Sequence, residues 1–248
     1  MDKIYHIDIN ADVGEGIGNE EKLMSFLSSC NIACGGHAGD AETMAKVINL
    51  AMKNDVKIGA HPSFPDKVNF GRLDMKISAE DLYSSLKYQI SALQNVLRLE
   101  GAQLHHIKPH GALYNLAAKD RKTAKVIIAV IKSIAMPIKL YAPYKSVIAE
   151  LAIDENIQVA FEAFADRNYN ENLSLVSRKN DDAMLLKKDS VLQHVLHIIK
   201  HGKVKTISGV EVSIKASTFC VHGDSKNALE ILKYLNQELP KNHILIQK

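Results

Sequence analysis

Residues 4–16, IYHIDINADVGEG, decide the fold. Apolar and polar residues alternate up to Asn10, and a dense polar group containing Asp12 and Glu15 follows at once. This alternation predicts a strand over residues 4–10 with one polar and one apolar face. The same unit, a short apolar strand that ends in polar side chains, recurs along the rest of the chain.

Strands and helices are expected to alternate from one end of the sequence to the other. Ser78 and Asp40 precede two of the expected helices as N-cap residues. Such alternation is typical of repeated βα units around a parallel sheet, and without an interrupting linker it predicts one domain over residues 1–248. The strands are expected at residues 4–10, 31–34, 56–61, 105–108, 138–142, 158–163 and 216–221, and the helices at 41–54, 79–100, 121–133, 146–155, 190–201 and 225–237.

Polar clusters follow six of these seven strands and favour a closed barrel over an open, doubly wound sheet. In a barrel the carboxyl ends of all strands surround one mouth, whereas an open sheet concentrates its ligands at one switch point. We therefore predict an α/β fold, an irregular seven-stranded (β/α) barrel, with the active site at its mouth. The clusters lie at residues 8–15, 34–40, 61–66, 108–115, 162–169 and 222–225.

Strand periodicity assigns many of these polar side chains to the barrel interior. Asn10 and Asp12 share one face of the first strand, and Glu162 and Asp166 share one register near the sixth. Ionisable groups inside a barrel need partners or shifted pKa values, so they are costly to keep for structure alone. The pattern indicates an active site.

Composition excludes several classes of protein. A formal net charge of +3 over 248 residues is too small for a nucleic-acid-binding surface. The sequence has no run of about eighteen apolar residues, so we expect no membrane span. Three cysteines, Cys30, Cys34 and Cys220, fit neither a paired disulfide framework nor a zinc-knuckle spacing, which favours a reducing, cytoplasmic location.

Six strings resemble those of the LamB/YcsF family, to which the A subunits of 5-oxoprolinases belong. They are DINADVGEG (8–16), NIACGGHAGD (31–40), GAHPSFPD (59–66), KPHGALYN (108–115), EAFADRNY (162–169) and CVHGDS (220–225). The resemblance covers almost the whole chain in order. It implies a barrel of the glycoside hydrolase/deacetylase type. One departure is Gly36, where the family usually has an aromatic residue.

The resemblance also implies a function: the A subunit of an ATP-dependent 5-oxoprolinase, which hydrolyses the lactam of 5-oxoproline to glutamate together with subunits B and C. A lactam is a poor electrophile, which explains why ATP would be needed. The sequence has no Walker loop, so the use of ATP follows from the resemblance alone. Three alternatives stay open: a metal-dependent deacetylase, a non-catalytic subunit of the same complex, and a lyase that forms a Schiff base at Lys108.

Acid–base chemistry at the mouth is expected to use a histidine with an aspartate, and which histidine acts as the base stays open. Asp40 has a second interpretation, as a helix N-cap only. The catalytic candidates are Asp12, Asp40, His61, His110, Asp166, His222 and Asp224, and the candidates for substrate binding are Asn10, Glu15, Lys108 and Arg167. Of the last group, Arg167 and Lys108 suit a carboxylate or phosphate.

A divalent metal ion is a further hypothesis. Asp12, His37 and His61 could converge from separate strands and activate water. No helical HxxxH or HExxH motif supports this site, and the same side chains also serve metal-free catalysis. The sequence is therefore compatible with a metal-dependent site and with a metal-free one.

Overall fold

The structure is a computed structural model that describes residues 3–223, 225 and 227–248. The predicted catalytic residue Asp224 lies outside the described residues. Seven parallel strands form a closed ring, since the last strand, β9, pairs with both β6 and β1. The predicted seven-stranded barrel is confirmed. In ring order the strands are β1 (Tyr5–Val13), β2 (Ser29–Ala33), β3 (Lys57–His61), β4 (Leu104–Ile107), β5 (Lys139–Pro143), β6 (Val159–Phe164) and β9 (Thr218–Cys220).

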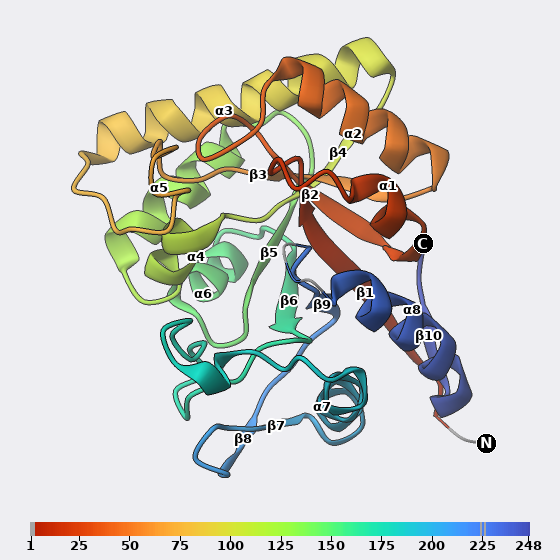
Figure 1. Ribbon diagram of the computed structural model, residues 1–248. Coiled ribbons are helices and arrows are strands. Elements are labelled where there is room, and N and C mark those ends of the chain that lie inside the picture. The colour runs from red at the N-terminus through yellow and green to blue at the C-terminus, as the bar shows by residue number, and fades with distance from the viewer. Residues whose placement is uncertain (1–2, 224, 226) are drawn as a thin grey trace.

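Helices surround the ring of strands (Figure 1). All six expected helices are present, with ends within three residues of the prediction, and Asp40 and Ser78 cap two of them by accepting backbone N–H groups of Thr43 and Asp81. The α-helices are α1 (Glu20–Leu23), α2 (Ala41–Lys53), α3 (Ala79–Glu100), α4 (Gly111–Ala117), α5 (Arg121–Lys132), α6 (Val147–Asp154), α7 (Lys188–His201) and α8 (Ala228–Glu238). The two shortest, α1 and α4, were not predicted.

The other elements missed by the prediction are also short. Strand β10 (Ile244–Ile246) extends the barrel beside the first half of β1, and β7 (Lys203–Lys205) pairs with β8 (Glu211–Ser213) in an antiparallel hairpin below the barrel (Figure 1). Elements of three residues are too short to show a periodic pattern. Three 3₁₀ helices complete the fold: η1 (Met24–Phe26), η2 (Asp181–Ala183) and η3 (Pro240–Asn242).

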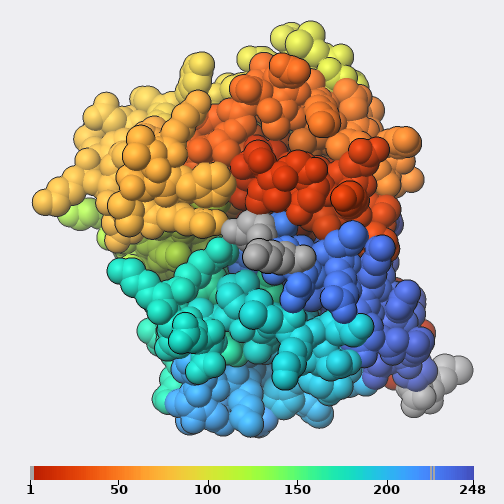
Figure 2. Space-filling view, in the orientation of Figure 1, coloured from red at the N-terminus to blue at the C-terminus, as the bar shows by residue number. Residues whose placement is uncertain are grey.

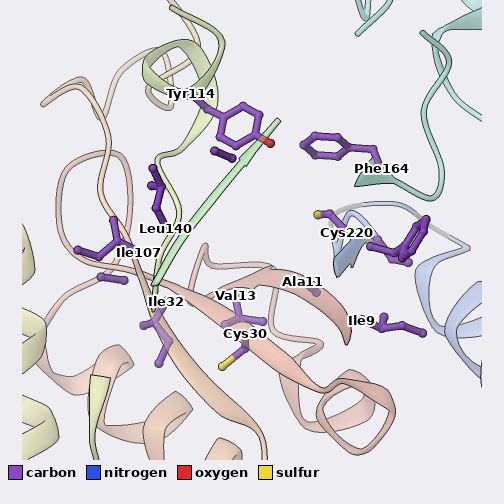
Figure 3. Packing of buried hydrophobic residues seen from close by; sticks show 14 of the residues in the cluster. Ile9, Ala11, Val13, Cys30, Ile32, Ile107, Tyr114, Leu140, Phe164 and Cys220 are labelled. Atoms are coloured by element: carbon purple, nitrogen blue, oxygen red, sulfur yellow. The ribbon is translucent and has the colours of Figure 1, made fainter. Parts of the chain in front are cut away.

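The strand faces follow the predicted registers. Ile9, Ala11 and Val13 of β1 belong to the apolar core (Figure 3), whereas Asn10 and Asp12 on the opposite face contact polar side chains across the barrel. No helix among the described residues is long and apolar enough to cross a membrane.

The carboxyl ends of the strands carry the longest connections. Figure 2 shows the segments after β1 (red), β3 (yellow-orange) and β6 (cyan) beside one another on one face of the molecule. Segments that are far apart in the sequence therefore meet at the barrel mouth, where parallel strands place their functional groups.

Candidate active site

A cavity of about 810 Å³ opens at the mouth of the barrel. Its lining comes from the ends of six strands. Three further predicted residues, Asn10, His37 and Asp166, are buried behind it and contact its lining. Seven of the predicted site residues form part of the lining: Asp12, Glu15, His61, Lys108, His110, Arg167 and His222.

Glu15, His37, His61 and His110 form a group that we call the histidine cluster. Their candidate ligand atoms all lie within 4.8 Å of one another. Glu15 Oε1 lies 2.9 Å from His37 Nε2, 3.3 Å from His110 Nδ1 and 3.8 Å from His61 Nε2. The rings of His37 and His110 stack, with centroids 3.7 Å apart. Sequence reasoning placed His37 and His61 at a metal, with Asp12, but assigned Glu15 to substrate and His110 to acid–base chemistry.

Backbone carbonyls fix the tautomers of two members of this cluster. His61 Nδ1 donates to the carbonyl of Lys108 at 2.7 Å, and His110 Nε2 donates to the carbonyl of Phe70 at 2.9 Å. A carbonyl only accepts, so the remaining nitrogens, His61 Nε2 and His110 Nδ1, carry lone pairs when the rings are neutral. These nitrogens face each other at 2.9 Å. Two facing lone pairs repel unless a proton or a metal ion lies between them.

The charge states in the cluster differ from ring to ring. Burial, together with the neighbouring His61, lowers the pKa of both His37 and His110 to about 3, so these two imidazoles are neutral at physiological pH. Burial also opposes charge on His61, but Asp12, whose Oδ2 lies 3.3 Å from Nε2, raises the pKa of His61 above its usual range. Neutral imidazoles oriented by backbone carbonyls are the form in which histidine binds metals.

Gln89 of α3 supports the cluster from behind. Its side-chain amide accepts from the N–H of Ser63 at 3.0 Å and donates to the carbonyl of Ser63 at 2.9 Å, two residues after His61. A Cβ atom at Gly36, beside His37, would lie 2.3 Å from Gln89 Oε1. Gln89 therefore occupies the space beside Gly36, the position where the resemblance leads us to expect an aromatic residue.

Asp166 and His222 form a second centre, which we call the dyad. His222 Nδ1 donates to Asp166 Oδ1 at 2.8 Å, and the backbone N–H of His222 donates to Asp166 Oδ2 at 3.0 Å. Burial alone would raise the pKa of Asp166, but its interactions with His222 lower it below the usual range. An ionised Asp166 holds His222 in the tautomer whose Nε2 carries a lone pair, and His222 lines the cavity.

Lys108 lies at the floor of the cavity and is already surrounded by acceptors. Its Nζ lies 2.9 Å from Glu162 Oε1, 3.0 Å from Asp12 Oδ1, 3.2 Å from Asn10 Oδ1 and 3.2 Å from Cys220 Sγ. An ammonium group has three protons, so these four acceptors leave none for a ligand. Burial opposes its charge, yet Asp12 raises the pKa of Lys108 well above its ordinary value.

Glu162 and Tyr114 belong to the site but were not among the candidates predicted from the sequence. Both line the cavity, and Tyr114 donates its hydroxyl proton to Glu162 Oε2 at 2.7 Å. The ring of Tyr114 meets Phe164 edge to face, with centroids 5.8 Å apart (Figure 3). The inward register of Glu162 was visible in the sequence, whereas Tyr114 lies on the unpredicted helix α4 and gave no periodic signal.

Of the predicted residues that the structure describes, Asp40 lies outside this arrangement, whereas Arg167 belongs to it. Asp40 is exposed and caps α2, and it does not belong to the described lining of the cavity. Arg167 is 5% exposed and does line the cavity, while its Nε and Nη2 donate to the backbone carbonyls of Ala183 and Val176.

Comparison with solved structures supports the fold. A crystal structure titled as a lactam utilization protein from Thermus thermophilus superposes with a TM-score of 0.91 at 34% identity and covers 98% of this chain and 99% of that one. A GH18 chitinase from Pseudoalteromonas aurantia shares the fold alone, with a TM-score of 0.53 at 10% identity over 94% of this chain and 100% of that one.

Curated relatives match over nearly their full length. A protein named as the A subunit of 5-oxoprolinase from Haemophilus influenzae (strain PittEE) is 44% identical over 240 residues, which cover 97% of this chain and 98% of that protein. A protein of the same name from Alkaliphilus metalliredigens is 42% identical over 248 residues, covering 98% of this chain and 97% of that protein. The LamB/YcsF family model matches residues 7–248. The chain belongs to the LamB/YcsF family.

Proposed function

We propose that this chain is the lactam-hydrolysing A subunit of an ATP-dependent 5-oxoprolinase, converting 5-oxoproline to glutamate. The observation that carries the proposal is the Asp166–His222 dyad at the wall of a large polar cavity, in a chain 44% identical to proteins named as 5-oxoprolinase A subunits. Hydrolysis of a lactam needs a group that accepts a proton from water and a group that returns one to the ring nitrogen.

His222 suits both steps. Its Nε2 accepts a proton as water attacks the lactam carbonyl, and Asp166 stabilises the imidazolium that results. When the carbon–nitrogen bond breaks, the same Nε2 donates this proton to the departing ring nitrogen. Ring opening consumes one water, and the product carries a new carboxylate and a new amine.

The histidine cluster suits a divalent metal of the zinc type. Three imidazoles and one carboxylate are ligands that zinc prefers, and the facing lone pairs of His61 and His110 call for a positive charge between them. Glu15, His37, His61 and His110 would hold the ion, while Asp12 lies beside His61. When bound, such a metal would act as a Lewis acid on a carbonyl or a water molecule.

The partners and the nucleotide belong to the same proposal. We place phosphoryl transfer from ATP to the lactam oxygen in a complex with subunits B and C, in the cytoplasm; ADP leaves in that step, and after ring opening a second water releases the phosphoryl group as inorganic phosphate. The support is the name of the relatives, which describes one component of a larger enzyme, and the three buried cysteines, which are all unpaired.

Glutamate release from 5-oxoproline with ATP and magnesium tests the proposal. The chain is assayed alone, with the proposed partner subunits B and C, and with those partners after His222→Ala. Activity that requires both the partners and His222 is expected. Full activity with the His222→Ala chain would remove the dyad from the mechanism, and release of acetate from an N-acetylated sugar in place of glutamate would identify a deacetylase.

A further inference from the structure

Arg167 is a buried cation whose side chain has N–H groups that make no hydrogen bond to the described residues. It is 5% exposed and lines the cavity, and its Nε and Nη2 are fixed by the carbonyls of Ala183 and Val176 at 3.2 and 2.6 Å. Its other terminal nitrogen, Nη1, has no hydrogen-bond partner within the described part of the chain. A guanidinium group that is held rigidly with two unused N–H bonds is suited to bind an oxyanion.

Arg178 brings a second guanidinium close to the first. It follows Val176 in the loop that Arg167 anchors, and it lines the same cavity. Burial, and after it the positive charge of Arg178, lowers the pKa of Arg167. Two guanidinium groups on the wall of one cavity attract an anionic group of a ligand.

The charges of the cavity are separated. The acidic residues of the described lining, Asp12, Glu15 and Glu162, have side chains that are only 14%, 7% and 0% exposed, which places them at the floor. The positive charge of Lys108 is neutralised there by Asp12 and Glu162, and its three protons are already committed. An anionic group on a ligand is therefore repelled by the floor. The rim carries the opposite charge, with Arg72, Lys119, Lys145, Arg178 and Lys179 in the described lining.

We propose that the carboxylate of the lactam substrate binds at Arg167 and Arg178, and not at Lys108. This inference rests on the proposed function for the identity of the substrate. With the carboxylate held on the β6 side of the cavity, the ring is left to the floor, where His222 and the histidine cluster reach it. Arg178 is thereby a specificity residue that selects lactams carrying an anionic substituent.

Direct binding tests the proposal without relying on turnover. Ligand-observed NMR titrations of the full chain, alone and with its partner subunits, compare 5-oxoproline with 2-pyrrolidinone, the same ring without the carboxylate. The variant is Arg178→Gln, which lies on an exposed loop. The matched control is Arg98→Gln, an exposed arginine in the last turn of α3 that is absent from the described cavity lining.

We expect Arg178→Gln to weaken binding of 5-oxoproline by about 10- to 100-fold, the usual range for losing a charge-assisted hydrogen bond, and to leave 2-pyrrolidinone unchanged. Arg178→Lys should restore part of the affinity, and Arg98→Gln should have no effect. Equal losses for both ligands, or no loss for either, would overturn the proposal, as would a wild-type chain that fails to bind 5-oxoproline even with its partners.

Inorganic phosphate distinguishes the possible anions. Competition between phosphate and 5-oxoproline that depends on Arg178 supports the subsite, whereas binding of phosphate alone overturns its assignment to the substrate carboxylate. A chain that binds 5-oxoproline through Arg178 but yields no glutamate with its partners would refute the proposed function and leave the subsite standing.

Discussion

The two histidine centres at the barrel mouth differ in what holds their imidazoles. In the dyad, a buried carboxylate accepts from His222 Nδ1 and can stabilise a positive charge on the ring. In the histidine cluster, carbonyls hold His61 and His110 so that their lone pairs converge, and burial keeps His110 neutral. An imidazole that donates to a carboxylate is suited to proton transfer, because the carboxylate stabilises the protonated ring. An imidazole that donates to a neutral backbone carbonyl is suited to binding a metal ion. The two centres therefore predict different responses to substitution.

The largest effect is expected at the dyad. His222→Ala should lower kcat for glutamate release, measured with the partner subunits, by about 10²- to 10⁴-fold, because it removes the proton acceptor. KM should change little, since His222 is not assigned to binding. His201→Ala, an exposed histidine at the end of α7, is the control and should keep full activity. If the His222→Ala enzyme stays active, His222 is not the proton acceptor, and the division of proton transfer and metal binding between the two centres is wrong.

The second prediction is that substitutions in the two centres differ in their effect on Zn²⁺ binding. His61→Ala should weaken binding of Zn²⁺ by more than about 100-fold, because it removes a direct ligand. Removing a residue that only supports a ligand already lowers metal affinity by about 10- to 100-fold. The measurements are the zinc content of the purified protein and the rise in Tm on adding Zn²⁺. His222→Ala should leave both unchanged. Equal zinc binding by wild type and His61→Ala would show that Zn²⁺ does not bind at the histidine cluster.

A smaller effect is expected from substituting Gln89, which supports the loop after His61. Gln89→Leu leaves the buried N–H and carbonyl of Ser63 without partners, which should lower the free energy of unfolding by about 1–3 kcal/mol. It should also weaken Zn²⁺ binding by roughly 10-fold, because the loop after His61 loses its support.

Ser85→Ala is the matched control for Gln89. It removes a different hydrogen bond of the same amide, 3.1 Å long, and leaves both bonds to Ser63 in place. Zinc affinity should then stay at the wild-type value. If Gln89→Leu lowers the stability but not the zinc affinity, Gln89 stabilises the fold and does not position the metal ligands.

The last expected effect is a pH dependence of the free energy of unfolding, on the dyad's side of the barrel. His194 Nε2 donates to the carbonyl of Phe164, and burial lowers the pKa of His194 from 6.5 to about 4. The unfolded chain binds the proton first, so this contribution to stability is complete above pH 6.5 and is lost as the pH falls towards 4, at about 1.4 kcal/mol per pH unit.

His194→Gln tests this dependence, because glutamine retains a donor but does not titrate in this range. Urea unfolding at pH 7.5 and pH 5 should show a smaller difference between the two pH values for the variant than for the wild type. An unchanged difference would mean that other groups, such as the buried His106, account for the acid sensitivity.

The sequence by itself determined the ring of strands. Each strand of the barrel has a local period of two, and Asn10, Asp12 and Glu162 already shared the face that points inward. It also determined that most of the ionisable candidates would meet at one mouth, since parallel strands in a barrel bring their carboxyl ends together. These features depend on residues close in the chain, so a local pattern is enough to find them.

Only the tertiary structure decided which of these groups act together. Glu15 meets His110 across 95 residues of sequence, Lys108 donates hydrogen bonds to acceptors on β1, β6 and β9 at once, and the carbonyls of Phe70 and Lys108 select the tautomers of His110 and His61. None of these contacts has a local signature, because each depends on side-chain direction and on the closure of the ring. Charge, tautomer and pairing are properties of a three-dimensional neighbourhood, and that neighbourhood exists only once the barrel has closed.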